Sequence, residues 1–329
     1  MKKILILGLV AFLSLFLVYG FADAAVSGPC ANCHTMHYSQ GGGTLSSWGT
    51  AGPYSALLVN NCLGCHTTTG TDPLVGGYPY VRTSVAGGFT NNNCLAGGFF
   101  QPTANTADNN SDTDHDLGAT ASPAGFDAAE NAWYTGATNG LGCAGTNGCH
   151  GNQTDLDDMA AIKGGHHAPS VYRILYVGAN GVLGTGTADY EELLISGVGT
   201  AHNVYSATVG GPSISELCGK CHSNFHGSDD TGAASPFVRH PTDVAIPTTW
   251  DIYVNFATEW TADADAMRNH PLGFNAETET AANARVTCLS CHRSHGAQYN
   301  DILRWDYNAT QVAGSGVTYG CLGCHNRQR

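Results

Sequence analysis

The chain has 329 residues, of which 26 are acidic and 13 are lysine or arginine, so its formal net charge is −13 at pH 7. An acidic surface of this kind argues against nucleic acid and anionic lipid as binding partners. Cysteine and histidine are the informative residues, with 13 and 15 copies.

The first 24 residues have the pattern of a secretory signal peptide. Lys2 and Lys3 form a positive start, residues 4–18 form an apolar run, and Ala22-Asp23-Ala24 supplies a cleavage site with small residues. The apolar run is short for a membrane-spanning helix, and no second run follows it. We therefore expect an exported protein, either periplasmic or extracellular at the cell surface, with no transmembrane segment after cleavage.

The cysteines occur in a motif in which two cysteines, separated by two residues, are followed directly by histidine. This CxxCH pattern is the attachment signature of c-type haem, because the thiols bind the porphyrin and the histidine becomes the proximal iron ligand. Five regular copies are present, and a sixth has five residues between its cysteines. The cysteine pairs are Cys30/Cys33, Cys62/Cys65, Cys143/Cys149, Cys218/Cys221, Cys288/Cys291 and Cys321/Cys324, and the proximal histidines are His34, His66, His150, His222, His292 and His325.

A disulfide scaffold and a set of zinc ribbons are the two alternative interpretations of these cysteines. Neither explains why a histidine follows the second cysteine in every copy. Histidine accounts for only 15 of 329 residues, so five regular coincidences are not credible. The sequence therefore predicts six covalently bound haem c groups, of which the stretched Cys143/Cys149 site is the least regular.

The motifs divide the chain into segments. We expect a signal peptide at 1–24, an N-terminal two-haem module at 25–125, a central two-haem region at 126–285 and a C-terminal two-haem module at 286–329. Within them, Ser55–Cys65 and Ser213–His226 are predicted to be short helices that deliver motifs, and 171–177 a short strand.

The amount of protein per haem predicts the fold class. Removal of the signal peptide leaves 329 − 24 = 305 residues, about 51 for each of six haems. This is too little polypeptide to bury six large cofactors in an ordinary hydrophobic core. We expect mostly irregular coil with short α-helices wrapped around stacked haems, as in a multihaem cytochrome c, with few or no β-strands.

Each iron also needs a sixth ligand. Methionine would raise the potential, histidine gives lower potentials, and an open position permits substrate chemistry. Only three methionines follow the signal peptide, too few for six irons, whereas nine histidines lie outside the motifs. We therefore expect bis-histidine ligation. The seven distal candidates, one more than needed, are His37, His115, His167, His202, His226, His240 and His295.

Three of these candidates closely follow a proximal histidine. His37 and His295 come three residues after one, where they cannot reach their own iron, so we expect each to bind a neighbouring haem. His226 comes four residues after one. It is either a similar ligand or a histidine at the surface or bonded to a propionate.

Several stretches resemble exported multihaem c-type cytochromes with doubled CxxCH motifs, a family typical of bacteria that respire metals and other extracellular acceptors. The resemblance rests on Cys218–Asp243, which reads CxxCHxxFH and continues to SPFVRHPTD, and on 288–307, which reads CLSCHRSHGAQYNDILRWDY. It implies distal ligands at His115, one of His166 and His167, His202, His240 and His295. Cys94 and His270 depart from the family pattern.

Six-coordinate haems along one chain predict an electron carrier rather than an enzyme. The expected partners are other redox proteins and extracellular electron acceptors. One alternative is a multihaem reductase of a small oxyanion, which needs an iron with an open position and often has lysine as a proximal ligand; here Lys220 lies between two cysteines instead of behind them. The other is self-assembly into a conductive filament, with which the lightly charged chain is compatible.

Overall fold

The structure is a computed structural model, and part of the chain is described in it. The described residues are 28–36, 39–40, 43–44, 54–75, 78–90, 93–95, 97–100, 113–118, 140–151, 154–162, 166, 175, 213–226, 239–250, 253, 271–275, 280–309 and 320–325. The predicted signal peptide and the candidate ligands His37, His167 and His202 lie outside these residues. Among them, no helix is both long and apolar enough to cross a membrane.

The helices are short. The α-helices are α2 (Cys62–Cys65), α4 (Asp158–Ala161), α5 (Ile214–Gly219), α9 (Cys288–Cys291) and α10 (Cys321–His325). The 3₁₀ turns are η1 (Cys30–Asn32), η3 (Ser55–Leu57), η4 (Gly145–Asn147), η7 (Ser223–Phe225), η9 (Asn300–Ile302) and η10 (Tyr307–Ala309). Most of these elements include cysteines of a motif or directly adjoin a motif, so the attachment sites account for much of the helical structure.

Polar side chains define where these short helices begin. Asn61 caps α2 by accepting the backbone N–H of Gly64 at 2.7 Å. Helix α9 begins with a capping box, in which Thr287 and Ser290 satisfy each other's backbone N–H groups. Each cap supplies a partner for a backbone donor that a helix of one turn would otherwise leave unsatisfied.

The predicted helix over Ser55–Cys65 is wrong in its first half. Ala56 and Leu57 have φ angles of 57° and 58°, which is the left-handed region, and α2 begins only at Cys62. Two consecutive residues with a side chain in this region cost about 1–2 kcal/mol each relative to a right-handed turn. Helical periodicity in the sequence gave no sign of this turn.

The strands are two or three residues long. β3 (Thr67–Thr68) pairs in parallel with β6 (Arg82–Thr83), while β1 (Ser39–Gln40) with β2 (Gly43–Thr44) and β4 (Leu74–Val75) with β5 (Tyr78–Pro79) form antiparallel pairs. The largest sheet has the order β7 (Val244–Ala245), β9 (Ala284–Val286), β8 (Gly273–Phe274), with Val244 opposite Val286 and Gly273 opposite Arg285. Of the predicted strand at 171–177 only Leu175 is described, and it bridges to His150. The described residues thus agree with the predicted predominance of coil and short helices, with strands present as small pairings.

Hydrophobic packing is divided into small clusters. The largest in the described residues surrounds the three-stranded sheet and contains Ile246, Leu272, Phe274, Ala284 and Val286, with Trp250, Tyr253 and Cys324 packed against it. A second cluster joins Ile214 and Leu217 of α5 to Leu289 of α9. Within the described part of the chain, the hydrophobic packing thus consists of small separate clusters.

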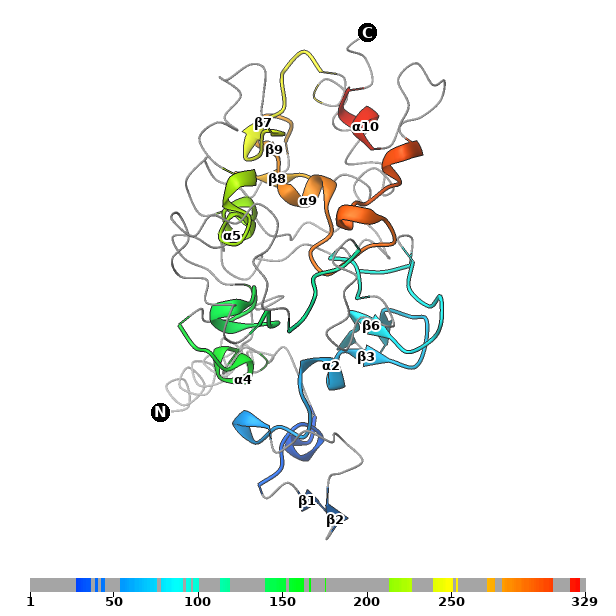
Figure 1. The fold of residues 1–329 in the computed structure, drawn as a ribbon, viewed down its shortest axis with the longest axis vertical. Coiled ribbons are helices and arrows are strands. Elements are labelled where there is room, and N and C mark those ends of the chain that lie inside the picture. Colours follow the sequence, from blue (N-terminus) through cyan, green and yellow to red (C-terminus); the bar gives the residue numbers. More distant parts are fainter. Residues whose placement is uncertain are drawn as a thin grey trace, which may run out of the picture.

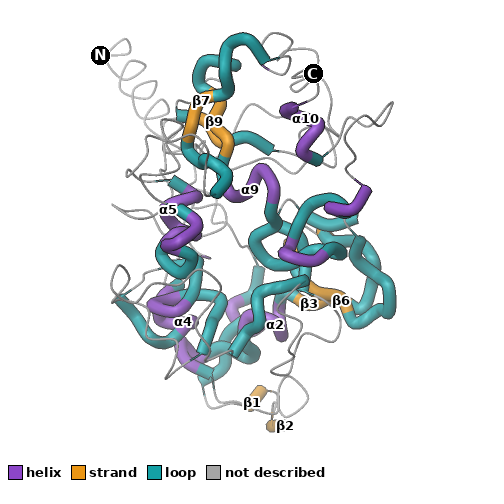
Figure 2. The backbone as a smooth tube through the Cα atoms, turned by 45° about the horizontal axis from the view of Figure 1, so that its top comes forward, coloured by secondary structure: helices purple, strands orange, loops and turns teal. Residues whose placement is uncertain are grey.

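The motif-bearing elements follow one another along the long axis of the molecule. Figure 1 shows β1 and β2 at one end, α2 and α4 above them, α5 and α9 further along, and α10 near the opposite end. Figure 2 shows the same succession after rotation. For the helices that carry motif cysteines (α2, α5, α9 and α10), the order along the chain is also the approximate order along this axis.

Candidate haem-attachment and iron-ligand sites

Four of the five regular motifs orient the histidine by the same backbone hydrogen bond. The backbone N–H of the histidine donates to the carbonyl oxygen of the first cysteine, at 2.9 Å for His34, 2.8 Å for His66, 3.0 Å for His222 and 2.9 Å for His292. This bond closes one turn and brings both thiols and the imidazole to neighbouring positions. All thirteen cysteines are free thiols, so a disulfide scaffold is not present.

The stretched motif reaches the same closure by a different route. The His150 N–H donates to the Cys143 carbonyl oxygen at 3.1 Å, although five residues separate the two cysteines. The extra residues fold into η4, where Gly145 has a φ of 72° and donates its N–H back to the His150 carbonyl oxygen at 2.9 Å. A third haem attachment site therefore fits the backbone here.

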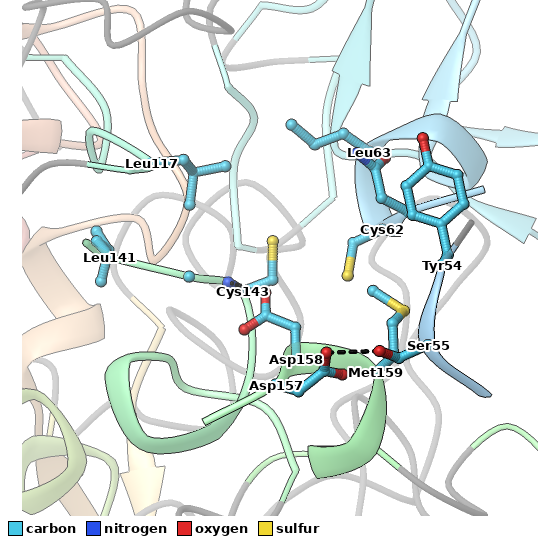
Figure 3. Close-up of a pocket in the computed structure, with 12 residues that line it drawn as sticks. Tyr54, Ser55, Cys62, Leu63, Leu117, Leu141, Cys143, Asp157, Asp158 and Met159 are labelled. Atoms are coloured by element: carbon cyan, nitrogen blue, oxygen red, sulfur yellow. Dashed lines mark hydrogen bonds between the residues drawn. The ribbon is translucent and has the colours of Figure 1, made fainter. Parts of the chain in front are cut away.

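A cavity of about 380 Å³ lies between the second and third motifs. Figure 3 shows the sulfur atoms of Cys62 and Cys143 facing it, from α2 and from the segment before η4. Tyr54, Leu63 and Met159 are among its mostly apolar lining residues. The two thiols belong to different motifs, so the cavity lies where the attachment sites of two consecutive haems meet.

The same two thiols also lie near a carboxylate, which raises the zinc alternative. Ligand atoms of Cys62, Cys143 and Asp158 lie within 4.8 Å of one another, the one such cluster found among the described residues. It offers three donors where structural zinc sites use four, and Asp158 already accepts the Cys143 backbone N–H at 2.9 Å. The cluster fits neighbouring haem attachments better than a zinc ribbon.

Several histidines have their protonation pattern set by backbone. Five of them direct Nδ1 at a carbonyl oxygen: His34 at Ala56 (3.1 Å), His66 at Pro79 (2.8 Å), His115 at Ser294 (2.8 Å), His240 at Pro241 (2.9 Å) and His292 at Asp301 (2.6 Å). A carbonyl oxygen only accepts, so Nδ1 carries the proton and Nε2 presents the lone pair. This is the arrangement in which an imidazole binds a metal through Nε2.

Burial favours the neutral, metal-binding form of two of these rings. It lowers the pKa of His115 to about 4, and the nearby His222 ring adds to this effect. Burial likewise lowers the pKa of His292. Both rings are therefore uncharged at neutral pH.

Four ring pairs each combine one motif histidine with one histidine outside the motifs. Their centroid separations are 6.2 Å for His66–His166, 6.2 Å for His115–His222, 6.2 Å for His150–His295 and 6.3 Å for His240–His325. Two imidazoles on opposite sides of one iron, each about 2 Å from the metal and with the ring centre about 1 Å further out, have centres about 6 Å apart. The four separations fit an iron between the rings, and no histidine occurs twice.

These pairs decide several points that the sequence left open. His166 lies against His66, while the predicted candidate His167 is outside the described residues. Adjacent histidines have identical spacing signals, so nothing in the sequence distinguished them. His295 lies against His150 of the central region, while His325 of its own C-terminal segment lies against His240.

His226 is placed differently from the other described candidates. It is 8% exposed, its Nδ1 lies 2.7 Å from Thr242 Oγ1, and its Nε2 lies 3.1 Å from Glu216 Oε1. Both ring nitrogens are engaged by side chains of the protein. Its geometry is that of a buried structural histidine.

Cysteines of consecutive motifs lie near one another. A hydrogen bond from Cys143 lowers the pKa of Cys62, and one from Cys218 lowers that of Cys288, which joins the second motif to the third and the fourth to the fifth. Burial raises the pKa of Cys65, Cys221 and Cys291, the last two to about 12, and in each case a cysteine of a neighbouring motif adds to the shift: Cys33, Cys149 and Cys324. Cysteines of consecutive motifs are thus neighbours at all five junctions, and at two of them the thiols are hydrogen-bonded.

Comparison with known proteins agrees with the site chemistry. Residues 281–329 match the model of the doubled CXXCH motif family. The C-type cytochrome OmcS of Geobacter sulfurreducens is 25% identical over a match that covers 86% of this chain and 80% of that protein. The resemblance to multihaem c-type cytochromes with doubled CxxCH motifs is confirmed.

Two solved structures are also similar. The OmcS nanowires of Geobacter sulfurreducens match with a TM-score of 0.40 and 21% identity, covering 83% of this chain and 82% of that one. The Outer Membrane Cytochrome S filament of the same organism matches with a TM-score of 0.41 and 20% identity, covering 89% and 88%. At these TM-scores the similarity does not establish a shared fold.

Proposed function

We propose that this chain transfers electrons through six covalently attached haem c groups, each held by two histidines. The observation that carries the proposal is the set of four histidine pairs with ring centres 6.2–6.3 Å apart. Haem, when bound, supplies a one-electron centre, and a second histidine ligand keeps the iron closed to substrates. The chain contributes attachment, ligand orientation and exclusion of water.

The ligand assignment follows from the pairs. His66 acts with His166, His150 with His295, His222 with His115, and His325 with His240. The first and fifth proximal histidines, His34 and His292, take their distal partners from histidines outside the described residues. Of the sequence-based candidates there, His202 can serve His34, whereas His37 cannot, because it lies three residues after it. His226 is then the surplus member of the seven.

The electron path runs through the haems in chain order. Its support is the proximity of cysteines from consecutive motifs at all five junctions, with hydrogen-bonded thiols between the second and third motifs and between the fourth and fifth. Neighbouring attachment points keep consecutive porphyrins near each other. The succession of elements along the long axis agrees with a row rather than a cluster (Figure 1). Such a row suits a carrier between redox proteins and acceptors outside the cell, and we propose an exported location for it.

Mass and ligand binding test this function. The intact mass of the purified protein is expected to equal the mature chain plus six haems. Cyanide and carbon monoxide are expected to leave the absorption spectrum unchanged, because every iron is six-coordinate. A mass with five haems would remove the stretched site, and a large spectral change would reveal an open iron and favour the reductase alternative.

Assembly into a filament is compatible with the same row of haems. Only 12% of the residues are charged, which permits close packing between copies. Sedimentation of the six-haem protein distinguishes the cases, since a single slow species identifies a discrete carrier and rapidly sedimenting polymers identify a filament subunit.

A further inference from the structure

Two left-handed turns stand next to the first and fifth motifs. In η3, Ala56 and Leu57 have φ angles of 57° and 58°; in η9, Asp301 and Ile302 have φ angles of 57° and 56°. Turns with two consecutive positive φ angles ordinarily use Asn-Gly or Asp-Gly. Neither turn contains glycine, and a branched side chain such as that of Ile302 is rare in this conformation.

The two turns make the same bonds to their motifs. The Ala56 carbonyl oxygen accepts His34 Nδ1–H at 3.1 Å, and the Asp301 carbonyl oxygen accepts His292 Nδ1–H at 2.6 Å. The next carbonyl, of Leu57 or Ile302, accepts the N–H of the residue after the histidine, at 2.7 and 2.9 Å. Two residues later, an N–H donates to the second cysteine of the motif, at 2.9 and 3.0 Å.

The two turns do not share these hydrogen bonds because of equal spacing from their motifs along the chain. Twenty-two positions separate His34 from Ala56, whereas nine separate His292 from Asp301. The flanking sequences share only a tyrosine before the turn, Tyr54 or Tyr299, and a leucine after it. Two different connections therefore end in one strained geometry, which indicates that the geometry itself is required.

The left-handed turn allows three successive backbone groups to face one motif. His66 obtains a carbonyl acceptor from Pro79 in the extended strand β5, so an acceptor alone does not require positive φ. At the first and fifth motifs the same short segment must bond the imidazole, the residue after it and the second cysteine. A right-handed turn would direct these groups to other positions.

We propose that the two turns are positioning elements for iron ligation, in which the Ala56 carbonyl orients His34 and the Asp301 carbonyl orients His292. The proposal rests on the proposed function, because it assumes that both imidazoles bind iron through Nε2. A carbonyl that accepts the Nδ1 proton makes Nε2 a stronger donor, which favours the oxidised iron and lowers its potential. Each turn therefore sets the potential of one haem.

Position 56 offers a test without loss of core packing, because Ala56 is exposed. Ala56→Gly accepts a positive φ without strain, Ala56→Val disfavours it, and Ala56→Pro forbids it by fixing φ near about −65°. Spectroelectrochemical titration of the six-haem proteins is expected to show a change in one of the six potentials. That potential should be lowest in the wild type and in Ala56→Gly, higher in Ala56→Val and highest in Ala56→Pro. The electron paramagnetic resonance signal of one low-spin haem should change in the same order of variants.

The denaturation midpoint supplies a second readout. Ala56→Gly should raise it, because glycine relieves the strain while the potentials stay constant. If potentials and resonance spectra are identical across the glycine, valine and proline series, the turn is only structural and the proposal is wrong. If Ala56→Pro matures without one haem, Ala56→Val tests the proposal instead, because valine keeps the backbone N–H.

Position 301 repeats the test at a different haem. Asp301 is exposed but charged, so Asp301→Asn, which tolerates positive φ, serves as the charge control for Asp301→Pro. The proline variant should raise a second potential, different from the one that responds at position 56; a response of the same haem would contradict the assignment. Failure of the proposed function would instead be visible in the unsubstituted protein, as fewer than six haems or an iron that binds cyanide.

Discussion

Replacing His226 with leucine separates a structural histidine from an iron ligand. The imidazole bonds Thr242 and Glu216, and its Nε2 lies 3.7 Å from Asp243 Oδ2, a carboxylate that also accepts the Ser213 hydroxyl at 2.5 Å. These contacts join α5, which carries the fourth motif, to the segment just before β7. Leucine fills similar space but leaves two carboxylates facing each other without the imidazole.

The expected loss of stability follows from the bonds removed. A hydrogen bond to a charged group contributes about 1.5–3 kcal/mol, and a buried partner left unsatisfied adds to the loss. Because His226 is only 8% exposed, we expect His226→Leu to lower the free energy of unfolding by about 3 kcal/mol. For a chain of this size that corresponds to a fall of roughly 5 °C in the denaturation midpoint.

The difference in stability between the wild type and His226→Leu should also depend on pH. Burial alone would lower the pKa of His226, but the hydrogen bond to Glu216 and the charge of Asp243 raise it above 6.5. A raised folded-state pKa stabilises the protein fully below the unfolded value and ceases to do so as pH rises through the folded one. The free energy of unfolding of the wild type should therefore exceed that of His226→Leu by the largest amount below about pH 6.5. The difference should decrease as the pH rises above that value.

Thermal denaturation followed by circular dichroism measures this effect, and absorption spectra report the irons. His226→Leu and His226→Met should both keep six haems with unchanged spectra. A high-spin iron in the leucine variant, or the absorption band of a methionine-bound ferric haem in the methionine variant, would show that His226 is a ligand and that the structural reading is wrong. Thr242→Val, which removes one neutral bond of the same ring, serves as the matched control with a smaller loss of about 1 kcal/mol.

Three further outcomes are expected. His166→Met should raise one of six potentials, whereas the neighbouring His167→Met should leave all six in place, as redox titration would show; the reverse result would exchange their roles. Gly145→Ala should weaken the stretched motif, because a Cβ would lie 2.4 Å from the Asp155 carbonyl oxygen at a φ of 72°; intact mass should show incomplete attachment of one haem. Ser290→Ala removes half of the α9 capping box and a 2.6 Å bond to the Pro271 carbonyl oxygen, so it should lower stability by about 1–2 kcal/mol in denaturant titration.

The predictions from sequence were most accurate where chemistry fixes local spacing. A thiol, two intervening residues, a thiol and an imidazole form one helical turn, so the motif histidines at 66, 222 and 292 close on their first cysteine as expected. The stretched copy closes in the same way because Gly145 permits a left-handed bend. The predicted helix over Ser55–Cys65 failed because its apolar pattern also suits a turn held by long-range bonds to His34 and Cys33.

The sequence by itself determined the number and position of the attachment motifs, since covalent chemistry acts on neighbouring residues. Only the tertiary structure decided which histidine faces which motif. His295 is three residues from His292 yet lies against His150, and His115 reaches His222 across more than a hundred positions. Which histidines face each other depends on how distant segments pack, and the spacing of residues along the chain does not specify that packing.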